Sequence, residues 1–149
     1  MGTIMMPFLA QIASQGIIVI ANGSPGNVTA SFASYANAAR STSKFQIAAI
    51  DWAIANAGKG DWAHMDATRV AAAGQSCGGL ETYGLITDDR VGTLGIFNSG
   101  NLGGGVSPAP TINKPIFYFL GGPTDVAYTP VSAYSMLIDL SPELPLMSL

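Results

Sequence analysis

The chain has 149 residues, about the size of one domain. Only 10% of these residues are charged, 6 basic and 9 acidic, whereas an ordinary soluble domain has roughly 25%. The basic residues are scattered singly and the net charge is −3, so a nucleic-acid partner is not expected. The apolar runs at 16–21 and 115–120 are far shorter than the roughly 20 residues that a bilayer requires, which argues against a membrane span. With 48% apolar residues, the composition predicts a chain that buries a large core under few charges.

The start of the chain and its cysteine content point to no particular compartment. Residues 1–8 lack the charged region and the small-residue cleavage site of a signal peptide. Cys77 is the single cysteine, which excludes an internal disulfide and a cysteine-rich metal site. No metal or organic cofactor is expected.

The first half of the chain alternates helix and strand patterns. A proline near its start and a glycine at its end predict a helix over 7–15. Residues 17–21 are apolar and β-branched without alternation, which predicts a strand covered on both faces. Ser43 and Gln46 form a capping box that predicts a second helix over 43–58.

The second half continues the alternation. Strands are expected over 69–73, 91–97 and 115–120, and a helix over 77–86, while the glycine- and proline-rich stretch 99–113 is expected to connect two strands. This alternation predicts an α/β fold with a mostly parallel sheet and helices on both faces.

One motif lies between a predicted strand and a predicted helix. Gly74-Gln75-Ser76-Cys77-Gly78 matches G-x-S-x-G in the setting that a nucleophile elbow requires. The turn would be so sharp that neighbouring side chains clash, which accounts for a glycine on either side. It would hold the Ser76 hydroxyl clear of the backbone and direct the N–H of Cys77 toward a developing oxyanion. The alternatives are a glycine-rich turn with a solvent-facing serine, or an anion site at a helix N-terminus.

Polar side chains follow the carboxyl ends of the predicted strands, where open α/β sheets bind their ligands. These residues are Asn22, Ser76, Asn98 with Ser99, and Asp125. Asp125 taken alone is a common type of turn residue. Together with the serine turn, it becomes the candidate acid of a catalytic triad.

Several segments together resemble the middle of an α/β-hydrolase, most of all secreted fungal esterase-like and dienelactone-hydrolase or chlorophyllase-like members. The segments are 12–23, 51–53, 73–79, 97–100 and 115–122 leading to Asp125. The resemblance covers about residues 5–128. It implies that Ser76 is the nucleophile, that Asp125 is the triad acid and that Cys77 donates one oxyanion-hole N–H. Members of this family are often secreted.

The family order of serine, acid and histidine implies a histidine after Asp125, and this sequence has none there. Its one histidine, His64, precedes the predicted strand that ends in the serine turn, and we expect it to be an ordinary loop residue. The first predicted helix also begins without the strands and the second oxyanion loop that precede it in the family. The expectation is a single incomplete α/β-hydrolase domain over 1–149, with an atypical tail at 126–149.

Three functions follow from this interpretation. The first is a serine hydrolase of small-molecule or polymeric carboxylic esters. The second is a catalytically inactive fragment or pseudoenzyme of the same family, because removal of the base from a triad costs about a millionfold in turnover. The third is a non-enzymatic α/β binding module. Missing outer strands would also leave sheet edges exposed and promote self-association.

Overall fold

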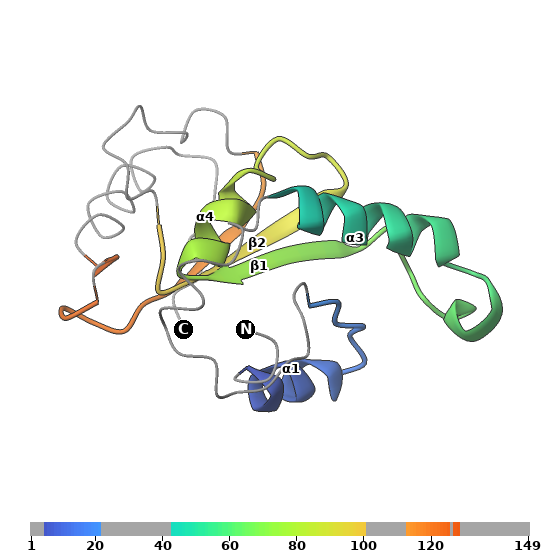
Figure 1. Cartoon of the computed structure of the whole chain (residues 1–149), viewed down its shortest axis with the longest axis horizontal. Helices are drawn as coiled ribbons and strands as arrows, with labels where there is room; N and C mark the ends of the chain where they lie inside the picture. The colour runs from blue at the N-terminus through green and yellow to red at the C-terminus, as the bar shows by residue number, and fades with distance from the viewer. Residues whose placement is uncertain (1–4, 22–42, 101–112, 126, 129–149) are drawn as a thin grey trace. The chain divides into compact units, whose positions relative to one another are not determined.

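A computed structural model describes residues 5–21, 43–100, 113–125 and 127–128 (Figure 1). The chain divides into two compact units, Met1–Ala67 and Thr68–Leu149. The first unit holds helices α1 and α3 and a short 3-10 turn, and the second holds a parallel sheet with helix α4. Most of the predicted connection at 99–113 and of the tail at 126–149 lies outside the described residues, as does the candidate Asn22. The single-domain organisation stays a prediction.

Helix α1 spans Met6–Ala13 and confirms the first predicted helix. Pro7 lies in its first turn, where the missing N–H costs no helical hydrogen bond. The helix ends before Gly16, which adopts a φ of 80° and donates its N–H to the Ala13 carbonyl at 3.0 Å. None of the residues of α1 is buried.

The strand predicted over 17–21 is wrong. These residues are described, but they form no strand, and Ile17 and Ile18 are 54% and 46% exposed. An apolar β-branched run becomes a strand only when a neighbouring strand pairs with its backbone. In the described part of the chain, the sheet contains β1, β2 and β3 and does not include this run.

Helix α3 spans Ser43–Asn56 and confirms the second predicted helix. Ile50 and Ala53 are its buried residues. The 3-10 turn Gly60–Trp62 follows, and the ring of Trp62 packs edge-on against that of Trp52, with centroids 5.0 Å apart. The two tryptophans therefore pack against each other within the first unit.

The second unit is built on three parallel strands in the order β1-β2-β3. Strand β1 spans Val70–Gln75, β2 spans Val91–Phe97 and β3 spans Ile116–Phe119. All three strands predicted in this part of the sequence are confirmed, and the chain belongs to the mixed α/β class. Alanine-rich β1 lies beside the β-branched β2 (Figure 1), which shows that pairing outweighs its weak propensity.

Helix α4 spans Cys77–Tyr83 and packs on β1 and β2. It ends three residues before the predicted end at 86, because the chain turns at Gly84, whose N–H bonds to the Glu81 carbonyl at 2.9 Å. Leu94 and Ile96 are fully buried in β2. Tyr83 of α4 shares a hydrogen bond between hydroxyls with Tyr118 of β3, the register partner of Ile96. The face that carries Ile96 and Tyr118 is therefore the one that α4 covers.

The alternate residues of the strands lie on the other face of the sheet. Phe97 and Phe119 are register partners there, with their rings stacked at 4.5 Å. Phe119 is 47% exposed and Phe117 is 40% exposed. Within the second unit, the described helix covers one face of the sheet, and an apolar part of the other face is exposed.

Candidate functional site

Ser76 forms the turn between β1 and α4 and has an unusual backbone conformation. Its φ of 54° and ψ of −120° match the first central position of a type II′ turn, which normally holds glycine. The Ser76 N–H bonds to the Phe97 carbonyl at 3.0 Å, and its own carbonyl accepts the Gly79 N–H at 2.9 Å. These bonds fix the turn to β2 on one side and to α4 on the other. A non-glycine residue held in this conformation lowers the stability of the folded state by about 1–3 kcal/mol.

The Ser76 side chain is exposed and does not cap the helix. Ser76 is the N-cap residue of α4, yet its hydroxyl makes no capping hydrogen bond. A serine at this position ordinarily accepts an N–H from the first turn, which is worth about 1 kcal/mol. The Ser76 hydroxyl is therefore presented to solvent, because the backbone holds a strained conformation and the side chain does not bond to the helix N-terminus.

Of the two motif glycines, the structure requires only Gly74, and it requires Gly79 in place of Gly78. A Cβ on Gly74 would lie 2.0 Å from the Gly78 carbonyl oxygen, so no side chain fits there. A Cβ on Gly79 would lie 2.4 Å from that of Ser99. A Cβ on Gly78 would meet nothing within 4 Å, so the clash predicted on that side of the serine is wrong. Close packing of α4 on the sheet therefore depends on Gly74 and Gly79.

Cys77 is the first residue of α4, and its thiol is free and exposed. Its N–H belongs to the first helical turn, whose N–H groups have no intrahelical acceptor. This N–H follows the Ser76 hydroxyl directly in the chain.

Asp125 lies in the turn after β3, and three hydrogen bonds from described residues hold its carboxylate. Its Oδ2 accepts the Gly121 N–H at 2.9 Å and the Asn98 side-chain Nδ2 at 2.8 Å. Its Oδ1 accepts the Ala127 N–H at 2.9 Å. The Gly121 N–H, then the Ala127 N–H and the Asn98 amide stabilise the ionised carboxylate and lower the pKa of Asp125. Asp125 is therefore an anion with a defined orientation.

The sheet places the serine and the aspartate at the same edge. Gln75, Phe97 and Phe119 are register partners at the carboxyl ends of the three parallel strands. Ser76 directly follows the first of them. The bond from Asn98 brings Asp125 to the end of the central strand, which neighbours the strand of Ser76. Adjacent strands lie about 4.8 Å apart, so about one strand spacing separates the end of the Ser76 strand from the end of the strand that leads to Asn98, the residue that bonds Asp125.

Asn98 and Ser99 are the other predicted edge residues that the structure describes. Asn98 has a φ of 45° and bonds to Asp125. Ser99 is fully buried beside Gly79, and its hydroxyl has no hydrogen-bond partner among the described residues. His64 is exposed in the turn after Gly60–Trp62, in the first unit. Its role as an ordinary loop residue stays a prediction.

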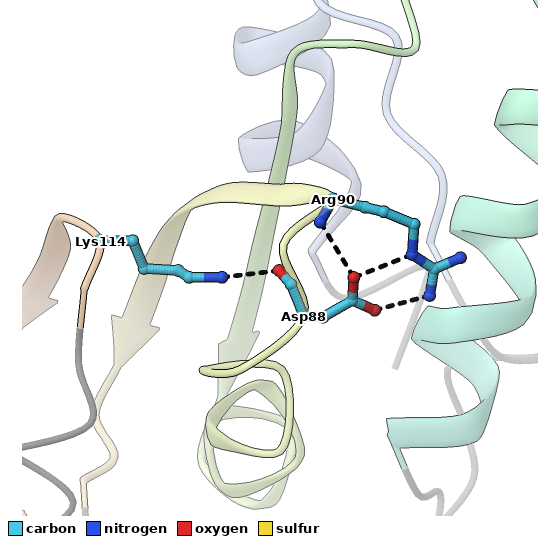
Figure 2. Close-up of polar contacts among 3 residues, drawn as sticks. All are labelled: Asp88, Arg90 and Lys114. Carbon is cyan, nitrogen blue, oxygen red and sulfur yellow. Dashed lines mark hydrogen bonds and ion pairs between the residues drawn. The ribbon is translucent and has the colours of Figure 1, made fainter.

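A cluster at the opposite edge of the sheet was missed by the sequence interpretation (Figure 2). The Asp88 carboxylate accepts Arg90 Nε at 2.8 Å, Nη2 at 2.6 Å and the Arg90 N–H at 3.0 Å. Lys114 is 6% exposed and donates its Nζ to the Asp88 carbonyl at 2.6 Å. The Arg90 side chain is the main reason that the pKa of Asp88 falls to about 2. The spacing of Asp88 and Arg90, two residues apart in the sequence, is the pattern that could have predicted this ion pair.

This cluster borders an open depression of about 220 Å³, lined by Asp89, Val91, Gly92, Asn113, Lys114 and Pro115. Lys114, two residues before β3, bonds to the carbonyl of Asp88, three residues before β2 (Figure 2). The Lys114 ammonium therefore links the segment before β3 to the turn before β2 through a hydrogen bond. The arrangement stabilises the amino edge of the sheet.

No helix among the described residues has both the length and the apolar character to cross a bilayer. Within the same residues, no three His, Cys, Asp or Glu side chains gather as ligands for a metal ion.

Fold and site together define a mixed α/β protein with a small parallel sheet, a strained serine turn and an anchored aspartate at one sheet edge. The chain matches no protein-family model, no curated protein and no solved structure.

Proposed function

We propose that this chain is a serine hydrolase of the α/β-hydrolase type that acts on carboxylic esters, with Ser76 as the nucleophile and Asp125 as the triad acid. The observation that carries the proposal is the conformation of Ser76. A positive φ that favours glycine is kept by a serine whose hydroxyl is exposed and makes no capping bond. Strain of this kind persists where the surrounding structure enforces it, often at reactive groups.

The surroundings of Ser76 support the same reaction. Strand β1, the serine turn and helix α4 follow each other in the order that a nucleophile elbow requires. Gly74 and Gly79 leave room for the close helix packing that such a turn needs. Asp125 at the same sheet edge is an oriented anion, as a triad acid must be to hold a histidine in one tautomer. The full hydrolase fold, with helices on both faces of the sheet, is part of the proposal.

In the proposed reaction, Ser76 Oγ attacks the ester carbonyl carbon while its proton passes to an imidazole base. The Cys77 N–H donates to the oxygen that becomes negatively charged in the tetrahedral intermediate. Collapse of the intermediate breaks the bond to the alcohol oxygen, which takes the proton from the imidazolium. Water then attacks the acyl-serine by the same sequence and releases the acid. Asp125 accepts the second N–H of the imidazole throughout.

A test must supply the imidazole base separately, because the 149 residues contain one histidine, His64. The chain should be treated with a fluorophosphonate probe with and without added imidazole. We expect labelling that imidazole accelerates, and a single modified peptide that contains Ser76. Ser76→Ala should abolish labelling. Asp125→Asn should slow it in imidazole, because the carboxylate no longer orients the base.

Ser14→Ala is the matched control, because Ser14 is an exposed serine whose hydroxyl bonds to the Gln11 carbonyl at the end of α1. Its labelling should equal that of the wild type. A folded chain, verified by circular dichroism, that takes no label at Ser76 with or without imidazole contradicts the proposal.

One observation favours a second candidate, an inactive member of the same family. The single histidine lies in an exposed turn of the first unit, before the strand that leads to Ser76. An inactive member would keep the strained serine and lack turnover of any ester. Ester hydrolysis that requires Ser76, with several turnovers per chain, would exclude this candidate.

A further inference from the structure

Asn98 follows the strand that lies between the strand before Ser76 and the strand before Asp125. It follows Phe97 at the carboxyl end of the central strand β2. The Phe97 carbonyl accepts the Ser76 N–H at 3.0 Å, and the Asn98 N–H bonds to the Phe119 carbonyl at 2.8 Å. The Phe97–Asn98 segment is therefore bonded both to the serine turn and to the strand that leads to Asp125.

The backbone of Asn98 directs its side chain. Its φ of 45° is in the left-handed region, which asparagine tolerates better than most residues with a side chain. In this conformation Nδ2 donates to Asp125 Oδ2 at 2.8 Å. A Cβ on Gly121 would lie 3.2 Å from that Nδ2, closer than most real contacts, so the glycine leaves room for the amide.

The two carboxylate oxygens of Asp125 differ in how many hydrogen bonds they accept from the described residues. Each carboxylate oxygen has about two acceptor sites. Among the described residues, Oδ2 accepts two donors, Asn98 Nδ2 and the Gly121 N–H, whereas Oδ1 accepts one, the Ala127 N–H. Donor groups of the described chain thus fill Oδ2 and leave acceptor capacity on Oδ1.

We propose that Asn98 is a positioning residue, which holds Asp125 through Oδ2 so that Oδ1 is the oxygen that accepts the N–H of the catalytic imidazole. This inference rests on the proposed serine-hydrolase function. Asn98 itself touches neither the ester nor Ser76 in this role. Its effect passes through the orientation of Asp125.

The test is Asn98→Gly, because glycine adopts the left-handed φ without strain and removes only the amide. Asn98→Asp is the second variant: it keeps the shape but replaces the donor with an acceptor beside a carboxylate. Thr93→Val is the matched control, since it removes a side-chain hydrogen bond, to the Pro115 carbonyl, from β2, the strand that precedes Asn98.

Two readouts are needed. The first is the pKa of Asp125, from carbon NMR of its carboxyl group during a pH titration, which requires no activity. It should rise in Asn98→Gly, rise further in Asn98→Asp, and stay unchanged in Thr93→Val. The second is the imidazole-dependent rate of fluorophosphonate labelling at Ser76. It should fall about tenfold or more in both Asn98 variants, as expected for loss of a hydrogen bond to a charged group.

The outcomes separate the two proposals. Wild-type labelling at Ser76 with unchanged labelling in Asn98→Gly overturns the positioning role and leaves the hydrolase proposal standing. A raised Asp125 pKa with slowed labelling supports both. If the folded wild type takes no label at all, both proposals fail, and a shifted Asp125 pKa would then report only a structural hydrogen bond.

Discussion

Serine is among the residues that most often cap a helix through their hydroxyl, yet Ser76 begins α4 without doing so. Its backbone adopts a conformation that glycine would accept without strain. Selection for stability alone would favour either a capping serine in an extended conformation or a glycine at this position. A serine with a positive φ and no capping bond lowers the stability of the fold and leaves its hydroxyl exposed.

The first prediction concerns this cost. Ser76→Gly should raise the free energy of unfolding by about 1 kcal/mol, because it removes the positive-φ strain. Ser76→Ala keeps the strain, and its stability should stay within about 0.5 kcal/mol of the wild type. Both should lose probe labelling. Urea denaturation measures the stabilities, and a Ser76→Gly chain that is less stable than Ser76→Ala would show that the turn is not strained.

Asp88 and Arg90 give a second prediction at this scale. The pKa of Asp88 is about 2 in the folded chain, below its ordinary value of 3.8, mainly because of the Arg90 side chain. A lowered folded-state pKa stabilises the protein above the unfolded value and is lost as pH falls through the folded one. This contribution should therefore be complete above about pH 4 and disappear near pH 2.

Arg90→Ala should raise the Asp88 pKa toward 3.8 and lower the free energy of unfolding at pH 7 by about 1 kcal/mol, since the Arg90 side chain is 38% exposed and solvent screens the pair. Denaturation at pH 7 and pH 2 measures this difference, which should vanish at the lower pH. Lys44→Ala, which removes an exposed positive charge from α3, is the control. A deficit of equal size at both pH values would show that Arg90 acts through packing instead.

At the scale of elements, the serine turn depends on how closely α4 lies against β1. Gly74→Ala should lower the free energy of unfolding by about 3 kcal/mol or more, because its Cβ would meet the Gly78 carbonyl at 2.0 Å. Gly78→Ala has open space and replaces glycine within a helix, so it should stabilise the chain by up to about 1 kcal/mol. Thermal denaturation of the two variants compares them. Equal destabilisation would show that the motif glycines act alike.

Prediction from sequence succeeded where local signals and pairing agree. The helices α1 and α3 begin and end near proline, serine and glycine signals, and β2 was predicted with its observed bounds. It failed at 17–21, whose apolar β-branched pattern cannot reveal whether a neighbouring strand is present to pair with it. Strand formation is a property of two segments, and only one is visible in a local pattern.

The candidate site was predictable in part for a similar reason. The sequence order of strand, serine and helix predicted the position of Ser76, and the rule for parallel sheets predicted the edge that it shares with Asp125. The link from Asn98 to Asp125 joins residues 27 positions apart in the chain and depends on a left-handed backbone angle. The Lys114 bond to the Asp88 carbonyl spans 26 positions. No local spacing encodes either contact.

For the whole molecule, the balance of charge and exposed apolar surface favours self-association. The net charge is −3 on 149 residues, so repulsion between copies is weak. In the described sheet, β1 and β3 each pair on one side only, with β2. The face opposite α4 exposes Phe117 and Phe119 next to the β3 edge. An unpaired edge beside exposed aromatic rings can pair with a second copy of the same sheet.

The double variant Phe117→Thr, Phe119→Thr should therefore reduce self-association, because threonine keeps strand propensity while it removes apolar area. In sedimentation velocity at micromolar concentrations, the wild type should sediment as a dimer or larger species and the variant should shift toward the monomer. Ile54→Gln, which removes an exposed apolar side chain from α3, should sediment like the wild type. A wild type that stays monomeric across the concentration range, with a cooperative unfolding transition, would contradict association through this face. Such a result would show that the exposed rings and the unpaired edge are compatible with a soluble, folded monomer.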